Sequence, residues 1–222
     1  MPDLVILAFT DFHGRQDTYR KAKQLISREQ PTLVVVAGDL VNYDAEHAKQ
    51  LLLELGQAGR PIYFVLGNMD NADLGDWPGS DRIHPLHGRC EHADELCLIG
   101  LGGSPLGPFK FSFGFTEESA ARLLNSLAKN CYGSRMILVS HCPPRNTKID
   151  RVLSGEHVGS ISVREFVERV QPLLVISGHI HEAQGVDKIG STTLVNTGAA
   201  QYDCFARIML GQTVTVSFQK LL

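Results

Sequence analysis

Continuous runs of apolar residues, each followed directly by a polar cluster, constrain the fold of this chain most strongly. Residues 4–10, 33–37 and 62–66 form three such runs, and segments with helical spacing at 17–29 and 45–58 separate them. A short continuous apolar run is typical of a strand that is buried on both faces. Strands that alternate with helices predict right-handed crossovers and a largely parallel sheet. The sequence therefore predicts an α/β fold.

The rest of the chain is less regular but continues to predict strands. Residues 71–88 mix Gly, Pro, Asp and His, which predicts a loop or a short helix. Beyond them, strands are predicted at 96–101, 136–140 and 173–177, and helices at 117–130 and 163–170. The last part predicts strands at 185–189, 192–196, 204–210 and 213–219. Because no linker or internal repeat separates these segments, we expect a single domain over residues 1–222.

The polar clusters hold side chains of the metal-ligand type. They are Asp11-Phe12-His13-Gly14, Gly38-Asp39, Gly67-Asn68-Met69-Asp70, Ser140-His141, Gly178-His179-Ile180-His181 and Asn196-Thr197-Gly198. Carboxylate, imidazole and amide oxygen together suit a hydrolytic metal site and not a thiolate site. The carboxyl ends of strands in an open α/β sheet converge on one crevice. We therefore expect these distant clusters to share one site.

The order of the clusters, D-x-H, G-D, G-N-x-D, H and G-H-x-H, resembles the calcineurin-like metallophosphoesterase family. The resemblance runs from Asp11 to Gly198, and the segments around 147–150 and 155–160 are more similar to the Icc-related predicted phosphoesterases. It implies a four-layer α/β/β/α sandwich, two bound divalent metal ions and hydrolysis of phosphoric esters. Manganese is the metal we expect most, although iron, zinc and nickel accept the same ligands.

The resemblance also implies a role for each matching residue. One metal would be held by Asp11, His13, Asp39 and His181, and the second by Asp39, Asn68, His141 and His179. Asp39 would bridge the two metals, and a water shared between them would act as the attacking hydroxide. His13 and Asp70 are candidates for additional catalytic roles, with Asp70 orienting a neighbouring ligand. Asn196 and Gly198 would position backbone groups beside the ligands.

Met69 departs from the family pattern. Family members commonly carry His at this position, and one subgroup carries Cys; this residue is usually proposed to protonate the leaving group. A thioether has no proton to give. Three alternatives follow: another donor, with His157 first and then His84 or His87; a leaving group that departs unprotonated; or a slow or different activity.

The loop at 143–160 and the low net charge indicate which class of substrate to expect. Arg145 and Lys148 in this loop are candidates for contacts with phosphate oxygens. A net charge of −3 argues against binding of long duplex nucleic acid. We expect a small phosphoester substrate, with phosphodiesters ahead of monoesters, and leave a homo-oligomer open. Two alternatives remain: a non-catalytic metal-binding scaffold of the same fold, and a nuclease acting on single-stranded nucleic acid.

Cysteine usage and the absence of long apolar segments bear on the compartment. Five cysteines, an odd number with no C-x-x-C pair, predict isolated core thiols in a reduced cytoplasmic setting. The first residues do not show a basic segment followed by a long apolar one, so no signal peptide is predicted. No apolar run is long enough to cross a membrane, and we expect no membrane partner.

Overall fold

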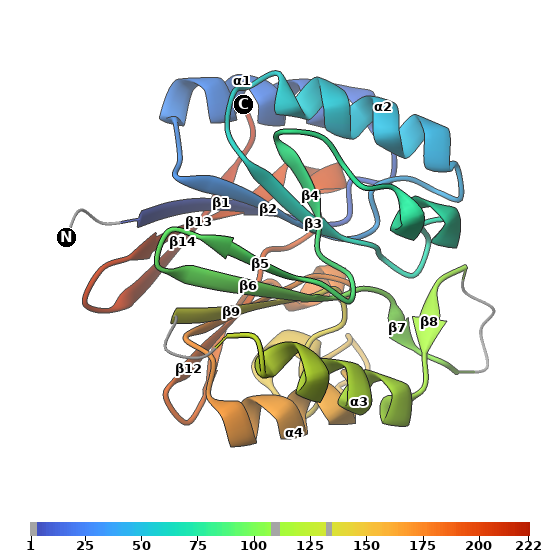
Figure 1. Cartoon of the computed structure of the whole chain (residues 1–222), viewed down its shortest axis with the longest axis vertical. Helices are drawn as coiled ribbons and strands as arrows, with labels where there is room; N and C mark the ends of the chain where they lie inside the picture. Colours follow the sequence, from blue (N-terminus) through green and yellow to red (C-terminus); the bar gives the residue numbers. More distant parts are fainter. Residues whose placement is uncertain (1–3, 108–111, 132–134) are drawn as a thin grey trace.

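Two six-stranded sheets pack face to face, and a pair of helices covers the outer face of each sheet (Figure 1). The computed structural model describes residues 4–107, 112–131 and 135–222. Within these residues the four layers follow one another as helices, sheet, sheet and helices. The predicted α/β/β/α sandwich is therefore confirmed.

The first sheet has the strand order β14-β13-β1-β2-β3-β4. Its strands are β1 (Leu4–Phe9), β2 (Leu33–Ala37), β3 (Ile62–Val65), β4 (Ile83–Pro85), β13 (Cys204–Leu210) and β14 (Val214–Lys220). Strands β1 to β4 are parallel, whereas β13 and β14 pair antiparallel. Helices α1 (Gln16–Glu29) and α2 (Ala45–Gly56) cover its outer face.

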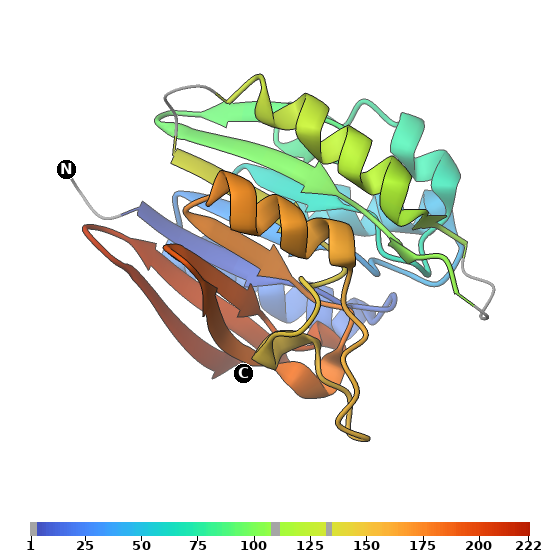
Figure 2. The same ribbon diagram turned by 90° about the horizontal axis from the view of Figure 1, so that it is seen from below.

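The second sheet has the order β11-β12-β10-β9-β6-β5. Its strands are β5 (Cys90–Ala93), β6 (Leu96–Leu101), β9 (Arg135–Ser140), β10 (Leu174–Ser177), β11 (Gly185–Ile189) and β12 (Thr192–Asn196). The four inner strands are parallel and the two edge strands are antiparallel to their neighbours. Helices α3 (Glu117–Ala128) and α4 (Ile161–Val170) lie side by side over this sheet (Figure 2).

Short elements complete the described chain. They are the two-stranded pair β7 (Ser104–Pro105) and β8 (Gly114–Phe115), and the 3₁₀ turns η1 (Ala72–Asp76), η2 (Lys148–Asp150), η3 (His181–Ala183) and η4 (Ala200–Tyr202). Turn η2 lies within the loop between β9 and α4. Turn η3 begins at His181, one of the predicted metal ligands, and therefore places this residue shortly after the end of β10 in the second sheet.

The apolar runs are continuous because both faces of the inner strands are buried. In β1, Leu7 and Phe9 pack under the helices, while Ile6 and Ala8 pack between the two sheets. All four side chains are fully buried. Complete burial of a large apolar side chain contributes roughly 1.5–3 kcal/mol relative to exposure. A second apolar layer between the second sheet and its helices holds that half together in the same way.

Most predicted elements are confirmed, but the middle of the chain contains two strands that the sequence does not predict. Residues 71–88 contain strand β4 in addition to the short turn η1, and residues Cys90–Ala93 form an edge strand that periodicity does not reveal. Both strands are very short, so neither shows an alternating pattern. Among the described residues, no helix is both long and apolar enough to cross a membrane.

The prediction of isolated core thiols is wrong for three of the five cysteines. A disulfide joins Cys97 to Cys131, and the Sγ of Cys90 lies 3.2 Å from that of Cys97. Cys142 and Cys204 are free and buried, as expected. The cluster forms because the β5–β6 pairing and the end of α3 bring together residues that are distant in sequence.

Candidate functional site

The predicted ligands lie where strands of both sheets end. Asp11, Asp39 and Asn68 follow β1, β2 and β3, while His141 and His179 follow β9 and β10. The structure brings all seven predicted ligands to this shared edge: Asp11, His13, Asp39, Asn68, His141, His179 and His181. The convergence expected from the strand order is thus present in the geometry.

Asp11 joins the two sheets at the site. Its Oδ1 lies 3.1 Å from Nε2 of His181, and its Oδ2 accepts hydrogen bonds from the backbone nitrogen of His179 and the hydroxyl of Thr10, at 3.0 and 2.7 Å. A side chain at Gly178 would overlap the Thr10 hydroxyl. Glycine is therefore required at this position for the two sheets to approach each other here.

Asp39 lies between two imidazoles. Its Oδ2 is 3.8 Å from Nε2 of His13 and 3.7 Å from Nε2 of His141. The other carboxylate oxygen accepts a hydrogen bond of 2.8 Å from the backbone nitrogen of Met69, which fixes the carboxylate in place. One carboxylate oxygen of Asp39 therefore faces a histidine on either side.

Two histidines present lone pairs to the centre of the site. Nδ1 of His13 lies 3.0 Å from Oδ1 of Asn42, and its buried Nε2 has no hydrogen-bond partner among the described residues. His141 directs Nδ1 to the carbonyl of Ala37 at 2.7 Å, and its Nε2 faces Oδ1 of Asn68, 2.9 Å away. A cation satisfies such convergent lone pairs, and these observations show that the residues fit a divalent metal.

The electrostatics of the two aspartates also call for a cation. Burial, together with the charge of Asp11, raises the pKa of Asp39 to about 7. Burial also raises the pKa of Asp11, but the hydrogen bond from His181 and the charge of His141 outweigh it and hold that pKa below its usual range. Burial and the charge of His141 lower the pKa of His179 to about 3. Two buried carboxylates beside a neutral imidazole are suited to a metal ion.

Several of the ligands adopt a strained backbone. Asp11, His13, Asp39 and His179 have φ angles of 55°, 48°, 50° and 68°, in the left-handed region that non-glycine residues rarely adopt. Each such residue costs on the order of 1–2 kcal/mol. Hydrogen bonds between the turns hold this conformation, including Asp11 N to Gly38 O at 2.9 Å and His13 N to Asp39 O at 3.0 Å. Strain concentrated on one set of ligands is typical of a functional site.

Asp70 positions the turns that carry the ligands. Its fully buried carboxylate accepts hydrogen bonds from the backbone nitrogens of Leu40, Val41 and Gly67, at 3.1, 3.0 and 2.7 Å. Burial and the charge of Asp39 raise its pKa to about 7, against the effect of these three hydrogen bonds. The geometry supports the orienting role expected for Asp70, because the residue ties the turn after β2 to the turn after β3.

A cavity of about 820 Å³ opens beside His179. Its lining includes Arg145 and His157 from the loop after β9, and Glu182 from η3. Cavities of this size accommodate small-molecule ligands. Lys148, which the sequence also placed near phosphate, is exposed and is not part of this lining.

The candidate proton donors fall in different places. Nδ1 of His157 lies 2.7 Å from Oδ1 of Asp150, and its ring lines the cavity. His84 stacks on Tyr63, with ring centroids 4.8 Å apart, and His87 accepts a hydrogen bond from the backbone of Gly102. Neither of the last two lines the cavity, so His157 is the candidate that the geometry favours.

Sequence reasoning missed residues that support the ligands. Thr10 and Asn42 contact Asp11 and His13 through hydrogen bonds, and the hydroxyl of Tyr43 lies 3.4 Å from the sulfur of Met69. Thr10 directly precedes Asp11, whereas Asn42 and Tyr43 lie a few residues after Asp39, and this proximity to the motifs is the only signal that could have identified them. Asn196, which was predicted to support the site, donates to the carbonyls of Ile149, Gly178 and Ile180.

Comparisons with known proteins identify a family and a shared fold. The family model of the calcineurin-like phosphoesterases matches residues 4–183. The protein MJ1162 of Methanocaldococcus jannaschii is 30% identical over 203 residues, which cover 89% of this chain and 89% of that protein. The crystal structure of TT1561 of Thermus thermophilus has a TM-score of 0.80 and 16% identity, over the full length of both chains. A dimetal phosphatase from Danio rerio has a TM-score of 0.69 and 16% identity, over 99% of this chain and 96% of that one.

Proposed function

The chain belongs to the calcineurin-like phosphoesterase family, a class of metal-dependent phosphoric ester hydrolases, and we propose that it cleaves small phosphodiesters ahead of monoesters at a two-metal centre. The position of Asp39 carries this proposal. Its Oδ2 lies within 4 Å of both His13 and His141, which belong to the two expected ligand sets. A single-metal site would not need histidines on both sides of one carboxylate.

The ligands divide between the two ions around Asp39. Asp11, His13 and His181 would complete one set, and Asn68, His141 and His179 would complete the other. Bound there, two such ions would supply a hydroxide nucleophile near neutral pH and would neutralise charge on the phosphoryl oxygens. Manganese is the ion we favour, because carboxylate, amide and imidazole ligands suit it.

The cavity beside the ligands favours a diester over a monoester. Its lining includes the carboxylates of Glu156 and Glu182, which disfavour the second negative charge that a monoester carries. Val152, Val158 and Ile180 give the lining an apolar part that suits the second esterified group of a diester. Arg145, on the same lining, is placed to contact the single charge that remains.

His157 supplies the proton that Met69 cannot. Because Asp150 engages Nδ1 of His157, the remaining ring nitrogen, Nε2, is left for the cavity. A histidine oriented by a carboxylate is well suited to protonate a departing alkoxide. We assign His157 this role for poor leaving groups, with Asp150 as its positioning residue.

The first test is hydrolysis of bis(p-nitrophenyl) phosphate beside p-nitrophenyl phosphate, with manganese added, by the wild type, Asp39→Asn and Asp17→Asn. We expect metal-dependent activity that favours the diester and is lost in Asp39→Asn. Asp17 is an exposed residue of α1, so Asp17→Asn controls for the same chemical change and should retain full activity.

The other outcomes separate the alternative functions. Metal bound at the site without turnover of either ester would overturn catalysis and favour a binding scaffold. Cleavage of single-stranded DNA or RNA at a higher rate than either ester would favour a nuclease. A higher rate with the monoester would contradict the proposed preference while leaving the metal centre in place.

A further inference from the structure

A second group of potential metal ligands lies at the edge of the second sheet, around the Cys97–Cys131 disulfide, and takes no part in the phosphoesterase site. Cys90 and His92 are alternate residues of the edge strand β5, so both side chains point to the same face. His92 pairs directly with Cys97 of β6, which places that side chain beside them. Cys131 follows the end of α3 and packs with Cys97 in the same apolar layer. Four soft or borderline ligands therefore meet on one face.

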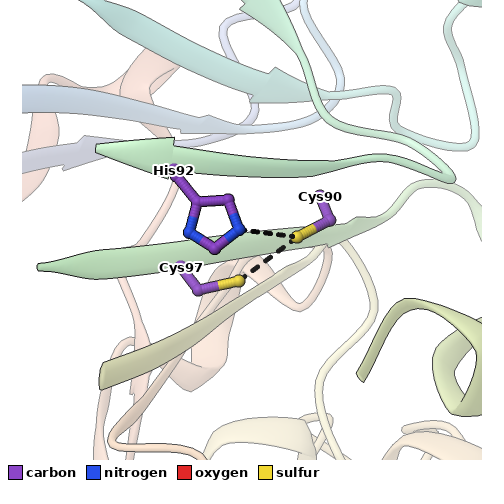
Figure 3. Close-up of side chains that lie close together, drawn as sticks. All are labelled: Cys90, His92 and Cys97. Atoms are coloured by element: carbon purple, nitrogen blue, oxygen red, sulfur yellow. Dashed lines mark hydrogen bonds between the residues drawn. The ribbon is translucent and has the colours of Figure 1, made fainter. Parts of the chain in front are cut away.

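The distances within this cysteine–histidine cluster are short. Sγ of Cys90 lies 3.2 Å from Sγ of Cys97 and 3.5 Å from Sγ of Cys131. Nε2 of His92 lies 3.9 Å from Sγ of Cys90 (Figure 3). The ligand atoms of Cys90, His92 and Cys97 all lie within 4.8 Å of one another. Cys97 and Cys131 are joined to each other by a disulfide.

A disulfide alone does not account for this arrangement. Two sulfurs form the bond, yet a third thiol contacts both of them and an imidazole lies against that thiol. Tetrahedral zinc with bonds of about 2.3 Å to sulfur and about 2.0 Å to nitrogen places its ligand atoms roughly 3.5–3.8 Å apart. The distances from Cys90 to its three neighbours all lie near that range. Three cysteines and one histidine form a ligand set that is common in structural zinc sites.

We propose that Cys90, His92, Cys97 and Cys131 bind one zinc ion in the reduced protein, and that the Cys97–Cys131 disulfide is the metal-free, oxidised form of the same site. The two forms exclude each other because they use the same two sulfurs. A dithiol supplies two electrons and two protons to open the disulfide and becomes a disulfide itself. Zinc then replaces the protons of three thiols, and His92 binds as the neutral imidazole.

Burial and exposure in the cluster suit a structural ion. Cys97 and Cys131 are 0% and 5% exposed, Cys90 is half-buried, and His92 is exposed. The ion would therefore have two ligands in the protein interior, one half-buried ligand, and one at the surface where it can enter. By joining the edge strand β5 to the end of α3, it would fix the edge of the second sheet.

This site is separate from the phosphoesterase site. Cys97 is the second residue of β6, whereas the phosphoesterase ligands follow the carboxyl ends of β9 and β10. Because β6, β9 and β10 are parallel, the two sites lie toward opposite ends of the sheet. The zinc site can consequently be tested independently of the proposed phosphoesterase activity.

Cobalt(II) tests the proposal, because sulfur ligands give it an intense near-ultraviolet charge-transfer band that oxygen and nitrogen ligands do not. We expect the wild type, reduced with a phosphine, to show this band on addition of cobalt and to lose it when zinc is added. Cys90→Ser should weaken binding by at least about 100-fold, on the scale expected when a metal site loses a supporting group. Cys204→Ser, at a free cysteine in the other sheet, is the matched control and should behave as the wild type.

Two further measurements keep the test decisive. His92→Ala changes only an exposed side chain and should also weaken the band, even if Cys90→Ser folds poorly. Alkylation of the reduced protein, followed by mass spectrometry, should show that added zinc slows the reaction of the three clustered cysteines. The rate at Cys204 should not change when zinc is added. Absence of the band in the reduced wild type, or its persistence in both variants, would overturn the zinc site and leave a disulfide with a neighbouring thiol.

Discussion

The first sheet presents its ligands on short turns, whereas the second sheet adds a long loop at the same edge. Asp11, Asp39 and Asn68 follow their strands directly, and hydrogen bonds to neighbouring turns fix the backbone of each turn. The loop at 143–160 contributes the cavity lining instead, with Arg145 and His157. We infer that the strained turns serve metal binding, whereas the loop lines the cavity in which we propose that the substrate binds.

Two carboxylates hold the long loop in place. Asp150 accepts hydrogen bonds from the backbone nitrogens of Asn146, Thr147 and Gly159, in addition to its contact with His157. Glu117, at the start of α3, accepts from the hydroxyls of Ser160 and Ser162 and from two backbone nitrogens where α4 begins. The loop is therefore anchored near its middle and at its end by single side chains, as Asp70 anchors the turns after β2 and β3.

The largest effect is expected when a rigid turn is disturbed. In Gly67→Ala, the new Cβ would overlap the backbone nitrogen and Oδ1 of Asp39, so the turn after β2 must move. We expect loss of manganese binding and a fall in kcat/KM of more than about 100-fold, because displacement of a positioned group by an ångström already costs that much. Gly75→Ala meets only an ordinary contact with Leu66 and is the control. Normal metal content in Gly67→Ala would show that the turn after β2 can shift without loss of metal binding, which contradicts its proposed rigidity.

A substitution in the loop should leave metal binding intact and slow the hydrolysis of esters whose leaving group needs a proton. In His157→Ala, hydrolysis of alkyl phosphodiesters should slow by ~10²–10⁴-fold, which is the usual contribution of a positioned acid. Nitrophenyl esters should be affected much less, because nitrophenolate departs without a proton. His84→Ala, outside the cavity, should change neither rate. Equal losses with both kinds of ester would remove His157 from the role of proton donor.

The smallest effect is expected at the anchor of the loop and depends on pH. Burial raises the pKa of Glu117, but hydrogen bonds from Ser162 and Ser160 outweigh it, so the pKa lies below its usual value. A depressed pKa means that its stabilising contribution is present above the pKa of the unfolded chain and is lost as the pH falls through the folded-state pKa. Glu117→Gln should therefore lower the free energy of unfolding by on the order of 1 kcal/mol at pH 7.

Urea unfolding at pH 7 and near pH 4 measures this difference, which should shrink at the lower pH. Glu118→Gln removes an exposed neighbour paired with Arg122 and should have little effect at either pH. A deficit in Glu117→Gln that does not change with pH would show that packing, and not the charged hydrogen bonds, holds the loop.

Strand order predicts that the candidate ligands of the phosphoesterase site meet at one edge, whereas the role of each residue rests on the family resemblance. Buried parallel strands produce continuous apolar runs, and the residues after them must meet at one edge. His179 and Asp11, which contact each other in the structure, are both identified in this way. The supporting hydrogen bonds of Thr10, Asn42 and Tyr43 are not predictable by this route, because they depend on side-chain directions within the turns.

The cysteine–histidine cluster shows what strand order cannot supply. The edge strand β5 is too short to show a period, and Cys131 lies beyond a helix. Spacing along the chain therefore gives no hint that Cys90, Cys97 and Cys131 meet. Lys148 shows the converse: its place in a basic loop suggested a phosphate contact, but η2 turns it outside the cavity lining.

The hydrogen bond between Asp11 and the backbone of His179 joins residues 168 positions apart and spans the two sheets. An ion held by ligands from both sheets would stay bound only while the sheets are docked, so we expect metal occupancy and global folding to form one linked equilibrium. At a free metal concentration of 100 times Kd, such linkage adds ~2.7 kcal/mol per site to the free energy of unfolding. We therefore expect the thermal midpoint of this protein to rise with the concentration of free metal around it.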